Sequence, residues 1–163
     1  MKQLLFVIAA LALLHACTQP PEYPVEPVIE YLSVSKNVMR EGKFQEDTLF
    51  VTIGFTDGDG DIGHEDTDNT IDLYVTDMRT GITDNSYKVP YVPELGSGNG
   101  ISGTITFQLY STCCIFDDPG YVPCEDVAPQ PTDTVQYEIY LIDRAGHVSN
   151  TVQTEPIIIQ CKQ

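Results

Sequence analysis

Aspartates gather in one short stretch of the chain, Asp57-Gly58-Asp59-Gly60-Asp61-Ile62-Gly63, and Asp68 follows a few residues later. Glycines between the aspartates let a backbone coil tightly, so that successive carboxylates can turn toward one centre. Carboxylate oxygens grouped in this way are the hard ligands that Ca²⁺ prefers. The stretch therefore predicts a calcium site that includes Asp57, Asp59, Asp61 and Asp68.

The same residues have a purely structural interpretation, because Asp-Gly pairs also make ordinary turns. Two carboxylates about 6 Å apart repel by about 3 kcal/mol at an effective dielectric near 20, but by only about 0.7 kcal/mol in bulk water. A loop that folds inward therefore needs a cation, whereas a loop that stays splayed in water needs none. Both interpretations remain open at the level of sequence.

An EF-hand does not fit this stretch, although Asp57, Asp59 and Asp61 match its first, third and fifth ligand positions. Ile62 stands where the turn glycine belongs, and Asp68 replaces the glutamate of the twelfth position. No flanking helices are expected either. We therefore predict a site in a loop between two strands.

Hydrophobic residues alternate with polar ones along most of the chain after residue 27, which is typical of half-buried strands. The expected strands are 28–35, 48–56, 71–76, 86–89, 101–110, 134–142 and 147–159. About seven strands with turn residues between them predict an all-β fold, an antiparallel β-sandwich of immunoglobulin, fibronectin or cadherin-like type. In such a sandwich the connections after 56 and after 142 lie at the same end. Asp143 then becomes a further candidate ligand, unless residues 143–146 only form a hairpin turn.

Four cysteines follow Cys17, namely Cys113, Cys114, Cys124 and Cys161. An even number in an exported protein indicates two disulfides. A bridge between the neighbours Cys113 and Cys114 would be strained, so we expect one of them to pair with Cys124 and the other with Cys161. The sandwich topology places all four at the end opposite the aspartates.

The N-terminus has the pattern of an export signal, because Lys2 and the apolar run Leu4–Leu14 precede Ala16 and Cys17. As a helix the run is about 16 Å long, whereas a bilayer core is about 30 Å thick, which argues against a transmembrane anchor. Cleavage after Ala16 would leave Cys17 as a lipidated N-terminus; an ordinary secreted protein is the alternative. We expect residues 1–16 to be the signal peptide, 17–27 a proline-rich tether and 28–163 the β-sandwich domain.

The chain is strongly acidic, with 24 Asp and Glu residues against 8 Lys and Arg residues and a formal net charge of −16. Such a polyanion repels nucleic acid and attracts divalent cations or a basic protein. His64 and His147 belong to no recognisable nucleophile motif, and tryptophan, which commonly stacks on sugars, is absent. We therefore expect no nucleic-acid binding and no enzymatic activity.

The lipobox-like Cys17, the motif Phe55–Gly63 and the motif Asp143–Asn150 together resemble small immunoglobulin-like outer-membrane lipoproteins of Bacteroidota. The resemblance implies a domain anchored to the outer membrane, on its periplasmic or cell-surface side, with no catalytic residues to carry over. The expected function is a non-catalytic structural or accessory subunit of an outer-membrane protein assembly, stabilised by Ca²⁺. The alternative is a surface binding module for an extracellular glycan or protein.

The tether also predicts an orientation. Strand 28–35 should begin at the aspartate end, and residues 18–27 can span up to about 30 Å as an extended proline-rich spacer. We therefore expect the aspartates to face the membrane and the cysteine-rich connection to point away from it.

Overall fold

The computed structural model describes residues 22–93 and 100–163. The predicted signal peptide, Cys17 and the first part of the tether lie outside the described residues. Within the two described ranges, no helix is long and apolar enough to cross a bilayer.

Ten strands make up the fold within residues 22–93 and 100–163. They are β1 (Val28–Val34), β2 (Val38–Arg40), β3 (Thr48–Asp57), β4 (Leu73–Asp77), β5 (Ile82–Tyr87), β6 (Ile101–Tyr110), β7 (Thr132–Val135), β8 (Tyr137–Leu141), β9 (Val152–Gln153) and β10 (Ile157–Gln160). The structure places β6 on the predicted range 101–110, where isoleucine, phenylalanine and leucine alternate with polar residues from Ile105 to Leu109.

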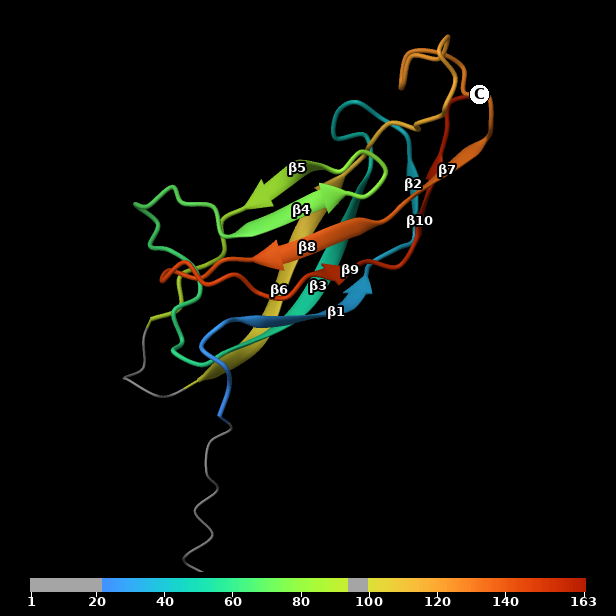
Figure 1. Cartoon of the computed structure of the whole chain (residues 1–163). Helices are drawn as coiled ribbons and strands as arrows, with labels where there is room; N and C mark the ends of the chain where they lie inside the picture. The colour runs from blue at the N-terminus through green and yellow to red at the C-terminus, as the bar shows by residue number, and fades with distance from the viewer. Residues whose placement is uncertain (1–21, 94–99) are drawn as a thin grey trace, which may run out of the picture.

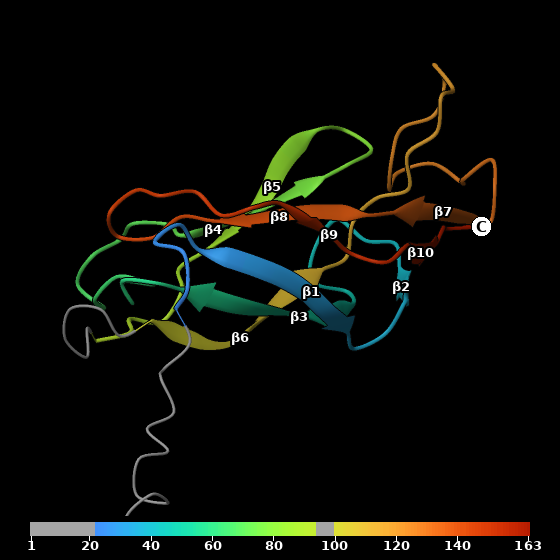
Figure 2. The same cartoon turned by 60° about the horizontal axis from the view of Figure 1, so that its bottom comes forward.

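The strands form two facing layers (Figures 1 and 2). One layer has the order β1-β3-β6 and the other β5-β4-β8-β9, while a small sheet, β2-β10-β7, lies at the end that holds the C-terminus. All pairings are antiparallel except that of β10 with β2. The predicted all-β, antiparallel sandwich is confirmed.

Two expected strands are divided between sheets. The range 134–142 becomes β7 and β8, which separate at Gln136, and the range 147–159 becomes β9 and β10, which separate before Pro156. At the second break, Pro156 has no backbone N–H to donate to a neighbouring strand. At the first break, the side chain of Gln136 donates a hydrogen bond to the backbone carbonyl of Thr154 at 2.9 Å. The chain therefore changes partner sheets at both points.

Two further ranges shift, and one short strand was not expected. The strand predicted at 71–76 begins at Leu73. The preceding Asp72 is buried, and its carboxylate accepts a hydrogen bond from the Val89 amide and contacts His64. The strand predicted at 86–89 lies at 82–87 as β5, next to β4. The three-residue strand β2 is too short to show an alternating pattern.

The core lies between the two layers. Leu49, Val51 and Ile53 of β3 and Ile139 and Leu141 of β8 are fully buried. Their alternation with more exposed neighbours along each strand is the pattern from which the strands were predicted. The two layers are therefore joined by the apolar face of each sheet.

Two disulfides fasten the end that holds the C-terminus. Cys113 pairs with Cys124 and Cys114 with Cys161, which is one of the two arrangements left open by the sequence. Glu41 supports both, because its Oε1 accepts hydrogen bonds from the amides of Cys114 and Cys124 at 3.2 and 3.1 Å. Glu41, Cys114 and Cys161 also form a cluster of potential metal ligands, but the disulfide removes the thiolates that a metal would need.

Candidate metal centre

The aspartate loop begins where β3 ends, at Asp57, and returns toward the core at Ile62. Gly60 and Gly63 have φ angles of 75° and 73°, a left-handed conformation that glycine adopts without steric cost. Ile62 is fully buried in the core. The residue that breaks the EF-hand pattern is thus the hydrophobic anchor of the loop.

Four aspartates meet at this loop. Asp57 is the last residue of β3, Asp59 and Asp61 come from the β3–β4 connection, and Asp143 comes from the connection that follows β8. One carboxylate oxygen from each lies within 4.8 Å of the other three. Asp57, Asp61 and Asp143 are buried, with 0%, 7% and 2% of their surface exposed. The structure therefore brings together four of the five predicted ligands.

Three of these carboxylates each have one buried oxygen without a hydrogen-bond partner in the described structure: Oδ1 of Asp57, of Asp59 and of Asp61. The opposite oxygens of Asp57 and Asp61 are used, because Oδ2 of Asp57 accepts from the Asp61 amide and Oδ2 of Asp61 from the Ala145 amide, both at 2.9 Å. Leaving a buried acceptor without a partner costs about 1–3 kcal/mol. Three of the four clustered carboxylates thus each keep one buried oxygen without a hydrogen-bond partner.

His147 orients the fourth carboxylate. Its backbone amide donates to Oδ1 of Asp143 and its Nδ1 contacts Oδ2, both at 2.8 Å. The hydrogen bond to Asp143, together with the charge of that carboxylate, raises the pKa of His147 above its ordinary value. Supporting hydrogen bonds of this kind hold metal-binding carboxylates in position.

The electrostatics of the cluster favour a cation. The pKa of Asp57 is raised to about 6, chiefly by burial and also by the nearby charges of Asp59, Asp61 and Asp143, while the hydrogen bond from the Asp61 amide acts in the opposite direction. Burial and the charge of Asp143 likewise raise the pKa of Asp61. Two unit charges 4.8 Å apart repel by about 3.5 kcal/mol at an effective dielectric near 20. A divalent cation at the centre would reverse the sign of these interactions, and an all-oxygen ligand set suits Ca²⁺.

Asp68 does not join the cluster, contrary to the prediction. It is exposed, and its Oδ1 accepts hydrogen bonds from the amide and hydroxyl of Thr70 at 2.9 and 2.7 Å. A side chain that bonds to the backbone two residues later forms a local turn. Asp68 therefore shapes the loop rather than its candidate ion site.

Arg144, the residue directly after Asp143, fastens the loops together. Its Nη1 donates to the carbonyls of Ile62 and Gly63 at 3.0 and 2.7 Å and to that of Val92 at 3.2 Å. Its guanidinium also lies 4.8 Å from the ring centre of Tyr91. In the sequence, Arg144 directly follows the candidate ligand Asp143, which places its side chain near the aspartate loop. The spacing of residues does not reveal which backbone carbonyls the Arg144 side chain contacts.

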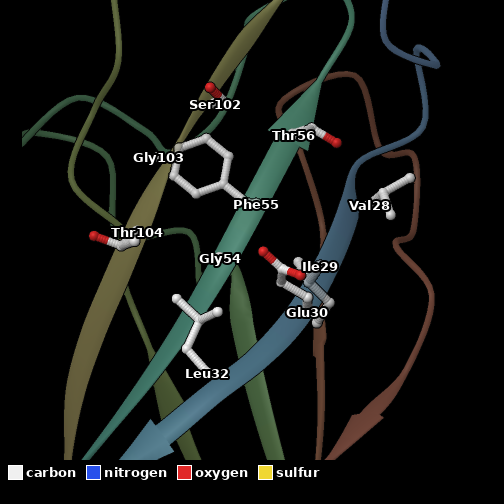
Figure 3. Close-up of a pocket in the computed structure, with 10 residues that line it drawn as sticks. All are labelled: Val28, Ile29, Glu30, Leu32, Gly54, Phe55, Thr56, Ser102, Gly103 and Thr104. Carbon is white, nitrogen blue, oxygen red and sulfur yellow. The ribbon is translucent and has the colours of Figure 1, made fainter.

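A separate hollow of about 430 Å³ lies on β1, β3 and β6 (Figure 3). Its lining includes Glu30 and Leu32 of β1, Gly54 of β3 and Thr104 of β6. A Cβ at Gly54 would lie 2.9 Å from the side chain of Glu30, so the glycine leaves room for that side chain. Glu30 is the one ionisable residue in this lining, which does not provide the pair of carboxylates that glycoside hydrolysis requires.

Comparisons with protein-family models, with curated proteins and with solved structures find no match for this chain.

Proposed function

We propose that the protein is a non-catalytic, lipid-anchored module whose sandwich is stabilised by Ca²⁺ at Asp57, Asp59, Asp61 and Asp143. It serves as a structural or accessory subunit of an outer-membrane protein assembly. The observation that carries the ion-binding part is the convergence of three buried carboxylate oxygens that have no partner among the described residues. Backbone amides of Asp61 and Ala145 satisfy the other oxygens of Asp57 and Asp61, and the three Oδ1 atoms are left without a partner among the described residues.

Calorimetric titration of the metal-free protein with Ca²⁺ tests this part. We expect one binding site and a rise in melting temperature, because an ion at one hundred times its Kd stabilises the folded state by about 2.7 kcal/mol. Asp61→Asn should abolish the heat of binding. Asp68→Asn is the matched control, since it removes an acidic side chain from the same connection but outside the cluster, and it should leave binding unchanged. Absence of heat and of thermal stabilisation at millimolar Ca²⁺ would contradict the proposal.

The assembly part rests on the predicted lipidation of Cys17 and on the arrangement of the two ends. The first described residues lie at the aspartate end, and the C-terminus lies with the disulfides at the other (Figures 1 and 2). Phe44, Ile115, Val122 and Val127 are exposed at the disulfide end, with Phe44 at 77%. A lipid anchor at the aspartate end would leave these apolar side chains free to meet a partner.

Extraction in mild detergent, followed by affinity purification, tests the assembly part. We expect a membrane protein to co-purify in constant ratio with the wild-type chain, and Phe44→Ser to reduce its yield. Val25→Ser, which replaces an exposed apolar residue at the opposite end, is the matched control and should not. Recovery of the chain alone would contradict an accessory role.

The hollow on β1, β3 and β6 favours a second candidate function, that of a binding module for an extracellular glycan or protein. This function predicts a ligand that raises the melting temperature of the isolated protein. Gly54→Leu, which would fill the hollow, should abolish this rise in melting temperature while leaving the co-purification with a membrane protein unchanged.

A further inference from the structure

The chain enters the sandwich across the same end that holds the four aspartates. The entry segment, residues 22–27, is the described part of the tether and leads directly into β1. Within it Tyr23 is half-buried and Pro27 is buried, whereas Pro24, Val25 and Glu26 are exposed. Figures 1 and 2 show this segment beside the β3–β4 and β8–β9 connections. It is therefore docked on the sandwich rather than extended away from it.

The entry segment packs directly on the backbone of Gly58, which lies between the candidate ligands Asp57 and Asp59. We call this contact surface at Gly58 the seat of the entry segment. A Cβ at Gly58 would lie 2.5 Å from the carbonyl oxygens of Tyr23 and of Pro24. Contacts below 3.0 Å cannot be accommodated without movement, and here the neighbour is backbone. The tether thus packs against the backbone between two of the ion ligands, and a change in the course of that backbone moves the seat.

Tyr23 and Asn150 provide two further attachments. A Cβ at Gly100 would lie 2.7 Å from the ring of Tyr23 and 3.1 Å from the carbonyl oxygen of Asp57, so ring, glycine and ligand backbone are in close contact. Asn150, in the connection that also carries Asp143, accepts a hydrogen bond from the Ile29 amide at 2.7 Å and donates one to the Ile29 carbonyl at 2.9 Å. Both loops that supply candidate ligands therefore also contact the entry segment or the beginning of β1.

We infer that an ion at the four-aspartate cluster locks the entry segment onto the sandwich and so fixes the direction in which the tether leaves the domain. Without the ion, the carboxylates of Asp57, Asp59 and Asp61, each of which has one buried oxygen without a partner, repel one another and the backbone at Gly58 relaxes outward. With the ion, the loop closes and the seat for Tyr23 and Pro24 is restored. This inference rests on the proposed ion binding and adds a role for it, the control of domain orientation at the membrane.

Binding equilibria that are coupled in this way must be reciprocal. If the ion favours docking of the entry segment, then docking must raise the affinity for the ion by the same factor. Tyr23→Ala removes the main side-chain attachment of the segment without altering any of the four aspartates. We expect it to weaken Ca²⁺ binding by about 5-fold or more, the lower end of typical coupling between sites. Val25→Ala is the matched control, because Val25 is 47% exposed in the same segment, and it should leave the affinity unchanged.

Backbone order measured by NMR relaxation on the full chain in detergent micelles provides the direct test. In the wild-type chain, Ca²⁺ should raise the amide order parameters of Tyr23, Val25 and Glu26 from about 0.6 or below toward about 0.85, the values of flexible and rigid backbone. In Tyr23→Ala and in Gly58→Ala, the same saturating Ca²⁺ should leave these amides flexible.

The possible outcomes separate the lock from the ion site. If calorimetry detects Ca²⁺ binding but the order parameters of the entry segment do not change, the lock is wrong and the ion site stands. The same conclusion follows if Tyr23→Ala binds Ca²⁺ as tightly as the wild type. If calorimetry detects no binding of Ca²⁺ at all, the proposed ion function fails and the lock fails with it.

Discussion

Asp57→Asn is expected to stabilise the metal-free protein and, at the same time, to abolish its stabilisation by Ca²⁺. Asp57 is fully buried, and its Oδ1 has no partner among the described residues. Asparagine keeps an oxygen for the Asp61 amide and places an N–H₂ group among the oxygens of the neighbouring carboxylates, where it can donate hydrogen bonds. In chelator we expect a gain of about 2 kcal/mol, or roughly 6 °C in Tm. Differential scanning calorimetry with and without Ca²⁺ measures both effects.

The pH dependence of this gain provides a second test. The pKa of Asp57 is about 6 in the folded protein against an ordinary value of 3.8, so the folded state holds its proton more tightly than the unfolded state. Below about pH 4 both states are protonated and the gain from asparagine should vanish. It should grow as the pH rises toward about 6 and stay constant above it. A gain that does not depend on pH would contradict burial of a charge at Asp57.

Asp77→Asn is the control for a buried aspartate that has its partners. Asp77 is 2% exposed, and its Oδ2 lies 2.6 Å from Nη2 of Arg79. Removing one partner of a buried ion pair costs about 3–5 kcal/mol, so this variant should lose stability equally with and without Ca²⁺. If Asp57→Asn behaves as Asp77→Asn does, the aspartate loop is only a turn.

The two disulfides are expected to contribute unequally. The bridge Cys114–Cys161 joins residues 47 apart in the chain, and Cys113–Cys124 joins residues 11 apart. Restriction of the unfolded chain alone then predicts losses of about 4 kcal/mol for Cys114→Ala/Cys161→Ala and about 3 kcal/mol for Cys113→Ala/Cys124→Ala. Burial widens the difference, because Cys114 and Cys161 are 0% and 7% exposed and their replacement leaves a cavity.

Urea unfolding of the two double variants measures the difference, provided that the slope of the transition stays constant. Calcium affinity is the internal control, since both bridges lie at the end opposite the four aspartates (Figure 1), and neither double variant should change it. Equal losses, or a larger loss for Cys113→Ala/Cys124→Ala, would show that strain or local packing outweighs the restriction of the unfolded chain.

The alternation of apolar and polar residues within a short segment was enough to predict that the segment forms a strand. The range of β6 was read from sequence because apolar residues alternate with polar ones from Ile105 to Leu109, where burial alternates as well. The division of 134–142 into β7 and β8 was not, because both halves keep the same alternation while they pair with different sheets. The partner of a strand is set by contacts distant in the chain, which periodicity does not record.

In the candidate metal centre as well, some residues could be predicted from sequence spacing alone and others could not. The spacing of Asp57, Asp59 and Asp61 was enough to predict that their carboxylates converge, because alternating glycines allow a tight coil. Asp143 was found only through the expected topology, which places the connections after β3 and after β8 at one end of a sandwich. Asp68 was included wrongly, since closeness in sequence does not ensure closeness in space, and its side chain bonds instead to Thr70.

The sequence by itself determined an all-β sandwich, a convergence of acidic side chains and two disulfides at the opposite end, because alternation, turn residues and cysteine number are properties of composition and order. Only the tertiary structure decided which oxygens at the aspartate loop lack partners, which cysteines are paired and that the backbone of Tyr23 and Pro24 rests against Gly58. The physical reason is that hydrogen-bond satisfaction and close packing are sums over neighbours from distant parts of the chain. Those neighbours exist only once the two sheets have met.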